Sequence, residues 1–566
     1  MRPVMGMPNA MKLVIDDRWF EGWRGPAIAA LIALIAGLPT VLTLGPLDRD
    51  ESRFAQATAQ MLETRDFTSI SFQDQPRHKK PVGIHWLQAV SVSLFSDVEH
   101  RDIRPYRVPS LLGAMLAAAA CAWGAGLAFG ARTGVLAGAI LGASFLLSSE
   151  AGIAKTDAML CGAVTLAMAA LSRLYIAQRD GLEPPGKRTK LLFWGAVALG
   201  VLIKGPIIVL VVGLTLVALG LWDRKWRWMT QLGWRWGLAL VLLGIGPWAL
   251  AITVKTDGAF WGAALGGDLF PKIVGGHERH GGWPGYYLLL APLLLFPATL
   301  LIPAGLSTGW AQRNQSAIRF ALCWLIPTWI AFELFPTKLW HYTLPTFGAL
   351  AWLMAASLTQ PLGTLSRRIG AGLMAFGALM VTALVIYGFS EYGGPGDQSW
   401  AAATIALALV GAAVGAFMLL NRMAVTALVV SLVFGVLAHA SLVKLISGLG
   451  PLWVAPRLEA ALREEGLHPM SGEAGGAVTL AGYSEPSAIF LIGTDTELGD
   501  GADAARALAA GRPAVVDQSQ AEAFAEEAAA LAMTPRPRAV IEGLNYSNGD
   551  QLRLSVYGPY REEAEP

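Results

Sequence analysis

A near-continuous series of apolar stretches runs from about residue 25 to residue 446 and restricts the fold more than any other feature of the chain. Each stretch is about 17 to 22 residues long, the length that an α-helix needs to cross a hydrocarbon core of about 30 Å. A chain inside a bilayer must satisfy its backbone hydrogen bonds internally, so these stretches are expected to be helices. The sequence therefore predicts an all-α polytopic membrane domain with about 13 transmembrane helices.

The lysine and arginine residues of the short connections indicate the orientation of the chain, because cytoplasmic loops carry an excess of both. With the N-terminus inside, every cytoplasmic connection contains a positive charge, and an odd number of spans places the tail outside. We therefore expect outer loops that include residues 48–106 and everything after about residue 448. The predicted spans are centred near Leu34, Leu116, Leu141, Thr165, Leu199, Val212, Leu242, Leu294, Ile326, Leu350, Ala375, Leu407 and Leu432.

Residues 449–566 differ in composition from the apolar part, residues 1–448. Short β-like segments near 477–483, 488–492, 513–516, 539–543 and 552–557 alternate with helical stretches rich in alanine and glutamate. This alternation predicts a small C-terminal extracytoplasmic α/β domain. It contains no obvious nucleophile and base pair and no glycine-rich phosphate loop, so we expect it to shape or cover a site formed by the transmembrane domain.

Charged residues gather in the outer loop 48–106, although only 15% of the chain is charged. Ionisable groups placed beside a bilayer usually serve a function. Asp50 and Arg53 are three residues apart and so share one helix face, whereas Glu51 points about 100° away. A carboxylate here can act as a general base towards a hydroxyl, and a guanidinium can hold a phosphate. A helix-capping aspartate with a surface ion pair is the alternative interpretation.

Further charged residues fall in the other outer connections. Residues 82–95 are too short and polar for a span and are predicted to form an interfacial helix, which follows Lys79 and Lys80. These lysines could bind a lipid-linked phosphate or anionic headgroups. Three short connections carry Lys155, Asp157, Lys204, Lys338, His341 and Tyr342. Helix capping by Asp157, a tight turn at Lys204 and an aromatic belt of His341 and Tyr342 are the alternatives, but repeated placement on one side favours a shared site. A fourth, glycine-rich connection carries His277, Glu278, Arg279 and His280, which suits a substrate-gating loop or a loosely bound metal, although the spacing matches no specific metal site.

Five motifs in order give the chain a family resemblance. They are DRDESRFAQATAQML, RHKKPVGIHWLQA, AKTDAML, LIKGP and PTKLWHYTLP. Together they resemble the bacterial lipid A aminoarabinose transferase and protein O-mannosyltransferase-like family of the glycosyltransferase C superfamily. The resemblance covers most of the membrane region and extends to phrases in the tail.

The resemblance implies transfer of a sugar, with inversion, from a polyprenyl phosphate donor, undecaprenyl phosphate in bacteria. The acceptor would be lipid A, a glycan or a protein on the outer face of the bacterial inner membrane. By position in the motifs, Asp50 is the expected base and Asp157 a second catalytic acid. The residues expected to bind substrate are Glu51, Arg53, Lys80, Lys204, His277, Arg279, Lys338, His341 and Tyr342.

One departure from the family concerns a metal ion. Many relatives carry Glu-Lys-Pro where this chain has Lys79, Lys80 and Pro81. In aminoarabinose transferases that glutamate has been linked to a bound metal, so a divalent metal cofactor is a weakened expectation here and its ligands stay unknown.

A transporter or flippase of lipid-linked saccharide is the main alternative function. Such a protein would be expected to place ionisable residues at the bilayer midplane and often to show two related halves. Here the charges collect at one edge. A membrane-anchored binding module is a second alternative, in which Asp50 and Lys80 would be dispensable. No basic run resembles a nucleic-acid footprint, so membrane lipids are expected as partners and nucleic acid is not.

Overall fold

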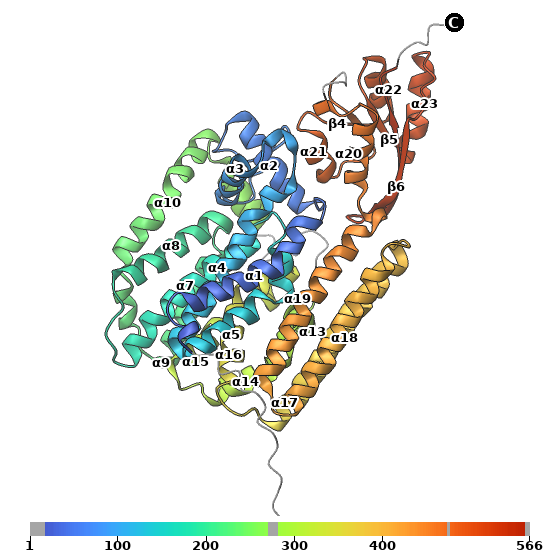
Figure 1. Ribbon diagram of the computed structural model, residues 1–566. Helices are drawn as coiled ribbons and strands as arrows, with labels where there is room; N and C mark the ends of the chain where they lie inside the picture. The colour runs from blue at the N-terminus through green and yellow to red at the C-terminus, as the bar shows by residue number, and fades with distance from the viewer. Residues whose placement is uncertain (1–16, 270–280, 472–475, 561–566) are drawn as a thin grey trace, which may run out of the picture.

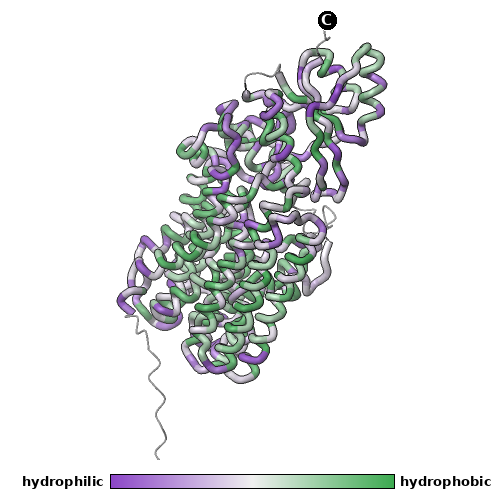
Figure 2. Tube along the Cα trace, turned by 45° about the vertical axis from the view of Figure 1, so that its right-hand side comes forward, coloured by the Kyte–Doolittle hydropathy of each residue, from purple (hydrophilic) through white to green (hydrophobic). Residues whose placement is uncertain are grey.

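The computed structural model describes residues 17–269, 281–471 and 476–560. Helices α1 to α19 form one elongated body, and the chain from α20 onwards forms a smaller body of helices and strands above it (Figure 1). Hydrophobic residues fill the middle of the helical body, while hydrophilic residues gather towards its two ends (Figure 2). This banding is what a bilayer requires of a polytopic protein.

Among the described residues, eight helices are long and apolar enough to cross a membrane. One bent pair, Tyr286–Leu294 and Ala298–Ala311, turns by 117° and would make a ninth span. The eight are α1 (Arg24–Thr43), α4 (Ile103–Phe129), α7 (Asp157–Arg179), α10 (Trp234–Lys255), α15 (Ser316–Leu334), α17 (Thr364–Tyr392), α18 (Gln398–Leu420) and α19 (Ala424–Gly448).

All thirteen predicted centres fall in helices, but thirteen full spans are not confirmed. Four centres lie in the shorter α5 (Ala131–Gly142), α8 (Lys187–Lys204), α9 (Ile207–Asp223) and α16 (Phe347–Ser357). Every residue of α16 is buried inside the protein. A helix surrounded by other helices need not match the bilayer thickness, because its ends reach protein rather than lipid. Helix α8 opens with basic residues, which shorten its apolar part.

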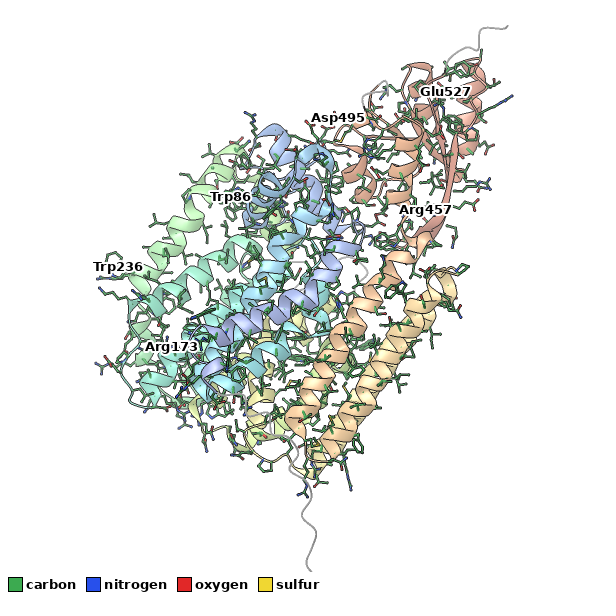
Figure 3. The ribbon with its side chains drawn as sticks, in the orientation of Figure 1. Trp86, Arg173, Trp236, Arg457, Asp495 and Glu527 are labelled. Carbon is green, nitrogen blue, oxygen red and sulfur yellow. The ribbon has the colours of Figure 1, made fainter. Side chains whose placement is uncertain are left out.

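Helix α7 is the centre of the helical body. In its most apolar 18-residue segment 83% of the residues are buried, and the helix packs against α4, α8 and α15. Two glycines allow the approach of α4. A Cβ at Gly113 would lie 2.4 Å from Cα of Met159, and a Cβ at Gly162 would lie 2.6 Å from the carbonyl oxygen of Gly113. Small residues at such crossings let transmembrane backbones meet. Helix α10 lies at the periphery: only 17% of the residues in its most apolar 18-residue segment are buried, and Trp236 points outwards from it (Figure 3).

The first outer loop folds against the end of this body. It contains α2 (Asp50–Thr64), a two-stranded hairpin of β1 (Ser71–Phe72) and β2 (Gln75–Pro76), and α3 (Gly83–Phe95). Helix α3 matches the predicted interfacial helix. Other short helices are α6 (Phe145–Glu150), α11 (Ala259–Trp261), α13 (Tyr286–Leu294), α14 (Ile302–Ala311) and the 3-10 helix η6 (Trp340–Thr346).

The C-terminal part is a five-stranded sheet with helices on both faces, in strand order β4-β3-β5-β7-β6. Strand β3 pairs in parallel with β4 and β5, and β7 pairs antiparallel with β5 and β6. Neighbouring residues of β5 face opposite cores, since Val515 packs with Leu458 and Val516 packs with Phe524. The strands are β3 (Thr479–Ala481), β4 (Glu497–Gly499), β5 (Ala514–Asp517), β6 (Ala539–Asn545) and β7 (Asp550–Tyr557), and the helices are α20 (Val454–Glu464), α21 (Pro486–Ile492), α22 (Gly501–Ala509) and α23 (Ala521–Ala530).

One sequence prediction in this part is wrong. Residues 488–492 were expected to be β-like, but they belong to α21, which Pro486 opens from its first turn. Proline suits the first position of a helix because it lacks an N–H and has a fixed φ. The apolar run is buried on all sides, so its composition does not distinguish a strand from a buried helix.

Candidate active site

Asp50 opens α2 at the outer edge of the helical body, and its side chain is 55% exposed. Its cation is not the predicted one. Nη2 of Arg77 lies 3.9 Å from Oδ1 of Asp50, whereas Arg53 is half-buried and makes no side-chain ion pair with the described residues. Sharing a helix face did not bring Arg53 to Asp50, because the loop after α2 folds back and places Arg77 there.

The ring of Phe54, one turn into α2, holds two cations beside Asp50. The Arg77 guanidinium lies 4.7 Å from its centroid and the Lys80 ammonium 5.2 Å. The other side of the ring stacks on His85 of α3, with 5.3 Å between centroids. Such cation–π contacts position charge without neutralising it. The ring of Phe54 therefore holds both positive charges beside Asp50.

These cations set the protonation of Asp50. Burial opposes ionisation, but Lys80 and Arg77 outweigh it and lower the pKa of Asp50 to about 2. The pKa of Lys80 itself falls to about 8, because of burial first and then the charge of Lys204. Asp50 is thus ionised at neutral pH, and Lys80 holds its proton less tightly than an ordinary lysine.

A second group of charges lies at the start of α7. The Lys204 ammonium is 2.5 Å from Oδ1 of Asp157, and the Lys155 ammonium is 3.0 Å from Oε1 of Glu150. His341 joins the two acids, with Nε2 3.6 Å from Asp157 and Nδ1 3.7 Å from Glu150. All five side chains are buried or nearly so. The group is therefore a compact charge network in a poorly solvated place.

Local structure explains the position of the pair Asp157 and Lys204. Asp157 is the first residue of α7 and Lys204 the last of α8, where a negative and a positive charge respectively suit the helix dipoles. Gly205 follows with φ +66°, which turns the chain sharply into α9. The Lys204 ammonium also lies 5.8 Å from the centroid of the Tyr342 ring. The predicted residues Asp157, Lys204, His341 and Tyr342 therefore meet at one place.

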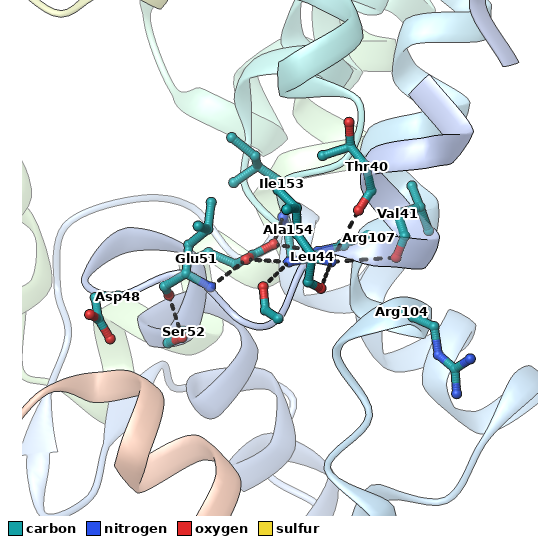
Figure 4. Close-up of polar contacts among 12 residues, drawn as sticks. Thr40, Val41, Leu44, Asp48, Glu51, Ser52, Arg104, Arg107, Ile153 and Ala154 are labelled. Carbon is teal, nitrogen blue, oxygen red and sulfur yellow. Dashed lines mark hydrogen bonds and ion pairs between the residues drawn. The ribbon is translucent and has the colours of Figure 1, made fainter. Parts of the chain in front are cut away.

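Glu51, predicted to bind substrate, makes buried contacts within the protein that hold the site together (Figure 4). Its carboxylate accepts two hydrogen bonds from Arg107, each of 2.8 Å, and one each from the backbone N–H of Leu47 and Ala154. Both side chains are fully buried. Arg107 also donates to the carbonyl oxygen atoms of Leu44 and Gly45. This ion pair ties the turn before Asp50 to the segment that carries Lys155 and Asp157.

Lys338, also predicted to bind substrate, contacts the backbone of the protein in this structure. Its ammonium donates to the carbonyl oxygen atoms of Phe332 and Glu333 and so closes the C-terminal end of α15. Burial lowers its pKa. The ammonium also lies 5.5 Å from the ring centroid of Tyr287. Its role in the described structure is to fix the path of the chain into η6. His277 and Arg279 lie outside the described residues.

The donor set Glu150, Asp157 and His341 has the composition of a metal site, with one ligand atom from each within 4.8 Å of the others. However, the carboxylates that would bind the ion already contact the ammonium groups of Lys155 and Lys204. Two fixed cations repel a third positive ion from the same oxygens. These residues therefore do not fit a resident divalent metal, and Lys79 is exposed at the surface.

A cavity of about 200 Å³ adjoins both groups of charges. Asp50, Glu150 and Lys155 line one part of it, and Phe145, Leu294 and Trp340 are among the residues that line the rest. Arg77 and Lys80 are not among the described lining residues, so they flank Asp50 outside the cavity. Asp50 therefore has the cations of Arg77 and Lys80 beside it and also lines the cavity.

Sequence reasoning missed Arg77 and Glu150 as candidates. Arg77 precedes Lys80 in the motif RHKK, so its closeness in sequence was a usable signal. Glu150 stands five residues before Lys155 at the end of α6, and only the fold of the intervening turn brings it beside His341. Burial keeps the pKa of Glu150 high, at about 7, against the opposing charge of Lys155.

Comparison with known proteins gives matches in sequence and in fold. A family model described as dolichyl-phosphate-mannose-protein mannosyltransferase matches residues 79–250. An undecaprenyl phosphate-α-4-amino-4-deoxy-L-arabinose arabinosyl transferase of Pseudomonas fluorescens is 29% identical over 352 residues, 61% of this chain and 62% of that protein. The corresponding transferase of Pseudomonas aeruginosa is 29% identical over 346 residues, 60% of this chain and 61% of that protein. The chain thus aligns with about three fifths of the length of these relatives.

Solved structures share the fold over nearly the whole chain. The crystal structure of ArnT from Cupriavidus metallidurans bound to undecaprenyl phosphate has a TM-score of 0.76 at 18% identity, covering 95% of this chain and 98% of that one. The archaeal oligosaccharyltransferase AglB from Archaeoglobus fulgidus has a TM-score of 0.50 at 12% identity, covering 88% and 70%. The likeness includes the C-terminal domain, since the match extends over most of the chain.

Proposed function

We propose that this chain, a member of the glycosyltransferase C superfamily in the group of lipid A aminoarabinose transferases and protein O-mannosyltransferases, transfers a sugar from a polyprenyl phosphate to an acceptor. The acceptor is a lipid such as lipid A, a glycan or a protein at the outer face of the bacterial inner membrane. The observation that carries the proposal is the placement of Asp50, an ionised carboxylate between two cations and a cavity. A base, an anion site and a substrate space thus meet at one residue.

The phosphate of the donor is proposed to bind to Arg77 and Lys80, with Lys204 nearby. Bond breaking at the anomeric carbon leaves negative charge on the phosphate, and cations already in place stabilise this charge more in the transition state than in the ground state. Lys80 supports this role because burial and Lys204 depress its pKa, a cost that a bound phosphate removes. Arg53, half-buried on α2, remains a proposed phosphate contact without a partner among the described residues.

Asp50 is proposed as the general base that takes the proton of the acceptor hydroxyl. A pKa of about 2 keeps it ionised but makes it a weak base in the free protein. A phosphate bound between Lys80 and Arg77 offsets the charges that lower this pKa, so donor binding raises the basicity of Asp50. The site thus gains its full base strength only when a donor is present.

The cavity is the proposed place for the sugar ring. Its volume of about 200 Å³ lies below the roughly 300 to 1,000 Å³ of pockets for drug-sized ligands, and so suits a single sugar unit. Trp340 can face the ring, while Glu150 has one buried carboxylate oxygen, Oε2, without a hydrogen-bond donor among the described groups. A sugar hydroxyl or amine would satisfy a buried acceptor of this kind.

Asp157 is proposed to act through Lys204, whose ammonium it holds at 2.5 Å, and Glu150 through Lys155 in the same way. His341 and Tyr342 complete this support. We propose that these ammonium groups supply the fixed positive charge of the site and that no divalent cofactor is needed. His277 and Arg279 keep their proposed part in substrate binding.

The proposed topology has a cytoplasmic N-terminus, a transmembrane domain of residues 1–448 and a periplasmic domain of residues 449–566. Loop 48–106 and the active site then face the periplasm, where lipid A and envelope glycans are found. The positive charges of the opposite connections support this orientation. Reporter fusions after α19 and after α4 would place the two ends of the helical body on opposite sides of the membrane.

The experiment is transfer of a radiolabelled sugar from synthetic polyprenyl phosphate sugars to envelope acceptors, with purified protein in lipid. Asp50→Asn is expected to lower the rate by about 100- to 10,000-fold, the contribution of a general base. Asp495→Asn is the matched control, because Asp495 is exposed on the C-terminal domain (Figure 3). Transfer that survives Asp50→Asn would refute the role of Asp50. Folded wild-type protein that transfers no sugar of the set would favour saccharide transport.

A further inference from the structure

The C-terminal domain rests on α2, on the side opposite the charges that face Asp50. The Phe490 side chain of α21 is fully buried against Ala55, Ala59 and Tyr106, with the Tyr106 ring edge-on at 5.3 Å. A fully buried aromatic side chain contributes substantial apolar burial to an interface. The domain is therefore docked on the helix that Asp50 begins.

A polar network beside Phe490 fixes the same helix. Arg101 donates to Gln56 at 2.9 Å and pairs with Glu63, while Thr494 of the C-terminal domain donates to Glu63 at 2.6 Å. Gln56 donates to Thr494 at 2.8 Å. Because Arg101 is 3% exposed, losing one member would leave a buried charge or donor unpaired. Helix α2 and the domain thus move as one unit.

A second set of contacts reaches the two residues before Asp50. The backbone N–H of Asp48 donates to the Tyr546 hydroxyl oxygen at 2.6 Å, and Ser487 donates to the Asp48 carboxylate. The Arg49 guanidinium donates to the carbonyl oxygen of Ser547. Tyr546 and Ser547 lie in the turn between β6 and β7. We call these contacts of Asp48 and Arg49 with residues 487, 546 and 547 the outer clamp.

The clamp holds a backbone conformation that its residue rarely adopts. Arg49 has φ +62° and ψ −106°, a region that a residue with a Cβ enters only with backbone strain. Such a conformation persists only where neighbouring contacts hold it in place. The Arg49 carbonyl oxygen accepts the first hydrogen bond of α2, from Arg53 N–H at 3.0 Å. The Arg49 backbone therefore sets the direction of the first turn of α2, and with it the direction in which the Asp50 side chain points.

We propose that the C-terminal domain is a positioning element of the active site, and that Tyr546 is the positioning residue through which it acts. Tyr546 fixes Asp48, and the clamp as a whole keeps Arg49 in the left-handed region, so that the Asp50 carboxylate faces Arg77 and the cavity. The domain then serves the chemistry without touching the substrate. The activity part of this inference rests on the proposed function, whereas its structural part does not.

The test compares Tyr546→Phe with Tyr560→Phe, a tyrosine elsewhere in the same domain, in the full-length protein. Loss of the hydroxyl should speed hydrogen exchange of the amides of residues 48–53, with the thermal midpoint of both variants near that of the wild type. For transfer, kcat should fall by roughly 3- to 10-fold, as expected for one lost hydrogen bond. The KM for the donor should stay unchanged, because the phosphate cations are untouched.

A second pair of variants separates positioning from general stability. Glycine adopts positive φ without strain, so in an Arg49→Gly background Tyr546→Phe should lower kcat by less than about 2-fold. In an Arg49→Ala background, which also loses the guanidinium but keeps Cβ, the full effect of Tyr546→Phe should remain. Equal losses in both backgrounds would overturn the proposal, as would unchanged amide exchange in residues 48–53. If Tyr546→Phe speeds exchange in residues 48–53 but the wild-type protein transfers no sugar, only the proposed function is overturned.

Discussion

Glu51→Gln is expected to destabilise the protein far more than its isosteric shape suggests. Four donors point at the Glu51 carboxylate: Nε and Nη2 of Arg107 and the backbone N–H groups of Leu47 and Ala154. Each oxygen of the Glu51 carboxylate accepts two hydrogen bonds. A glutamine replaces one of these oxygens by an NH₂ group, which is itself a donor and faces the two donors that the oxygen satisfied. It also leaves the Arg107 charge, 0% exposed, without its counter-ion.

The expected loss in the free energy of unfolding is about 3–5 kcal/mol, the usual cost of breaking a buried ion pair. For cooperative unfolding of all 566 residues, the unfolding entropy is on the order of 1.2 kcal/mol per kelvin. The thermal midpoint should therefore fall by about 2.5 to 4 °C, and by more if a smaller part of the chain unfolds as a unit. Thermal unfolding in detergent, followed by tryptophan fluorescence, measures the shift.

Glu542→Gln is the matched control, because Glu542 pairs with Arg553 at 3.3 Å and both side chains are more than half exposed. Such surface pairs contribute about 0–1 kcal/mol, so the thermal midpoint should move by less than about 1 °C. Transfer should fall in Glu51→Gln as well, since Glu51 joins the turn before Asp50 to Ala154. Equal thermal midpoints for the two variants would show that the buried pair does not hold the site together.

Three further predictions follow from the same charges. Burial raises the pKa of Asp48 from its ordinary 3.8 to about 6. The folded state therefore binds this proton more tightly than the unfolded state does. The stability that the bound proton confers is fully present below about pH 4 and is lost as the pH rises through 6. Asp48→Asn should therefore raise the thermal midpoint at pH 7.5 but not at pH 4. Lys80→Met should raise the KM for the donor. It should also shift the acid limb of kcat/KM to higher pH, because it removes a cation that lowers the pKa of Asp50. Lys79→Met, at an exposed position, should have neither effect. Glu150→Gln should raise the KM for the donor sugar, and an unchanged value would argue against the cavity as its place.

The elements of the fold were largely predictable from the sequence, because helix burial and bilayer crossing leave local patterns. Each predicted span centre lies in a helix, and helix α3 stands after Lys80 where an interfacial helix was predicted. The number of full-length spans was not predictable. Helices such as α16 are as apolar as a true span but are buried inside the protein, and hydropathy does not separate lipid contacts from protein contacts.

The site was predictable in its motifs but not in its pairings. Asp50, Lys80, Asp157 and Lys204 were predicted as candidates because each stands among the charged residues of an outer connection. The partners of these residues come from distant segments. Glu51 finds Arg107 at a separation of 56 residues and Ala154 at 103, and such contacts depend on tertiary packing that spacing along one helix does not reveal.

The outer clamp also has a consequence for how the protein is made. Asp48 and its partner Tyr546 are separated by 498 residues, a distance that a ribosome covers in about 25 to 100 s. In the proposed topology the first outer loop is translocated early, yet the turn before Asp50 stays unclamped until the last strands of the chain have been made and folded. If the clamp positions Asp50 as proposed, a nascent or truncated chain carries the cations of the site before its base is aligned, and full transfer activity is expected only from the finished molecule.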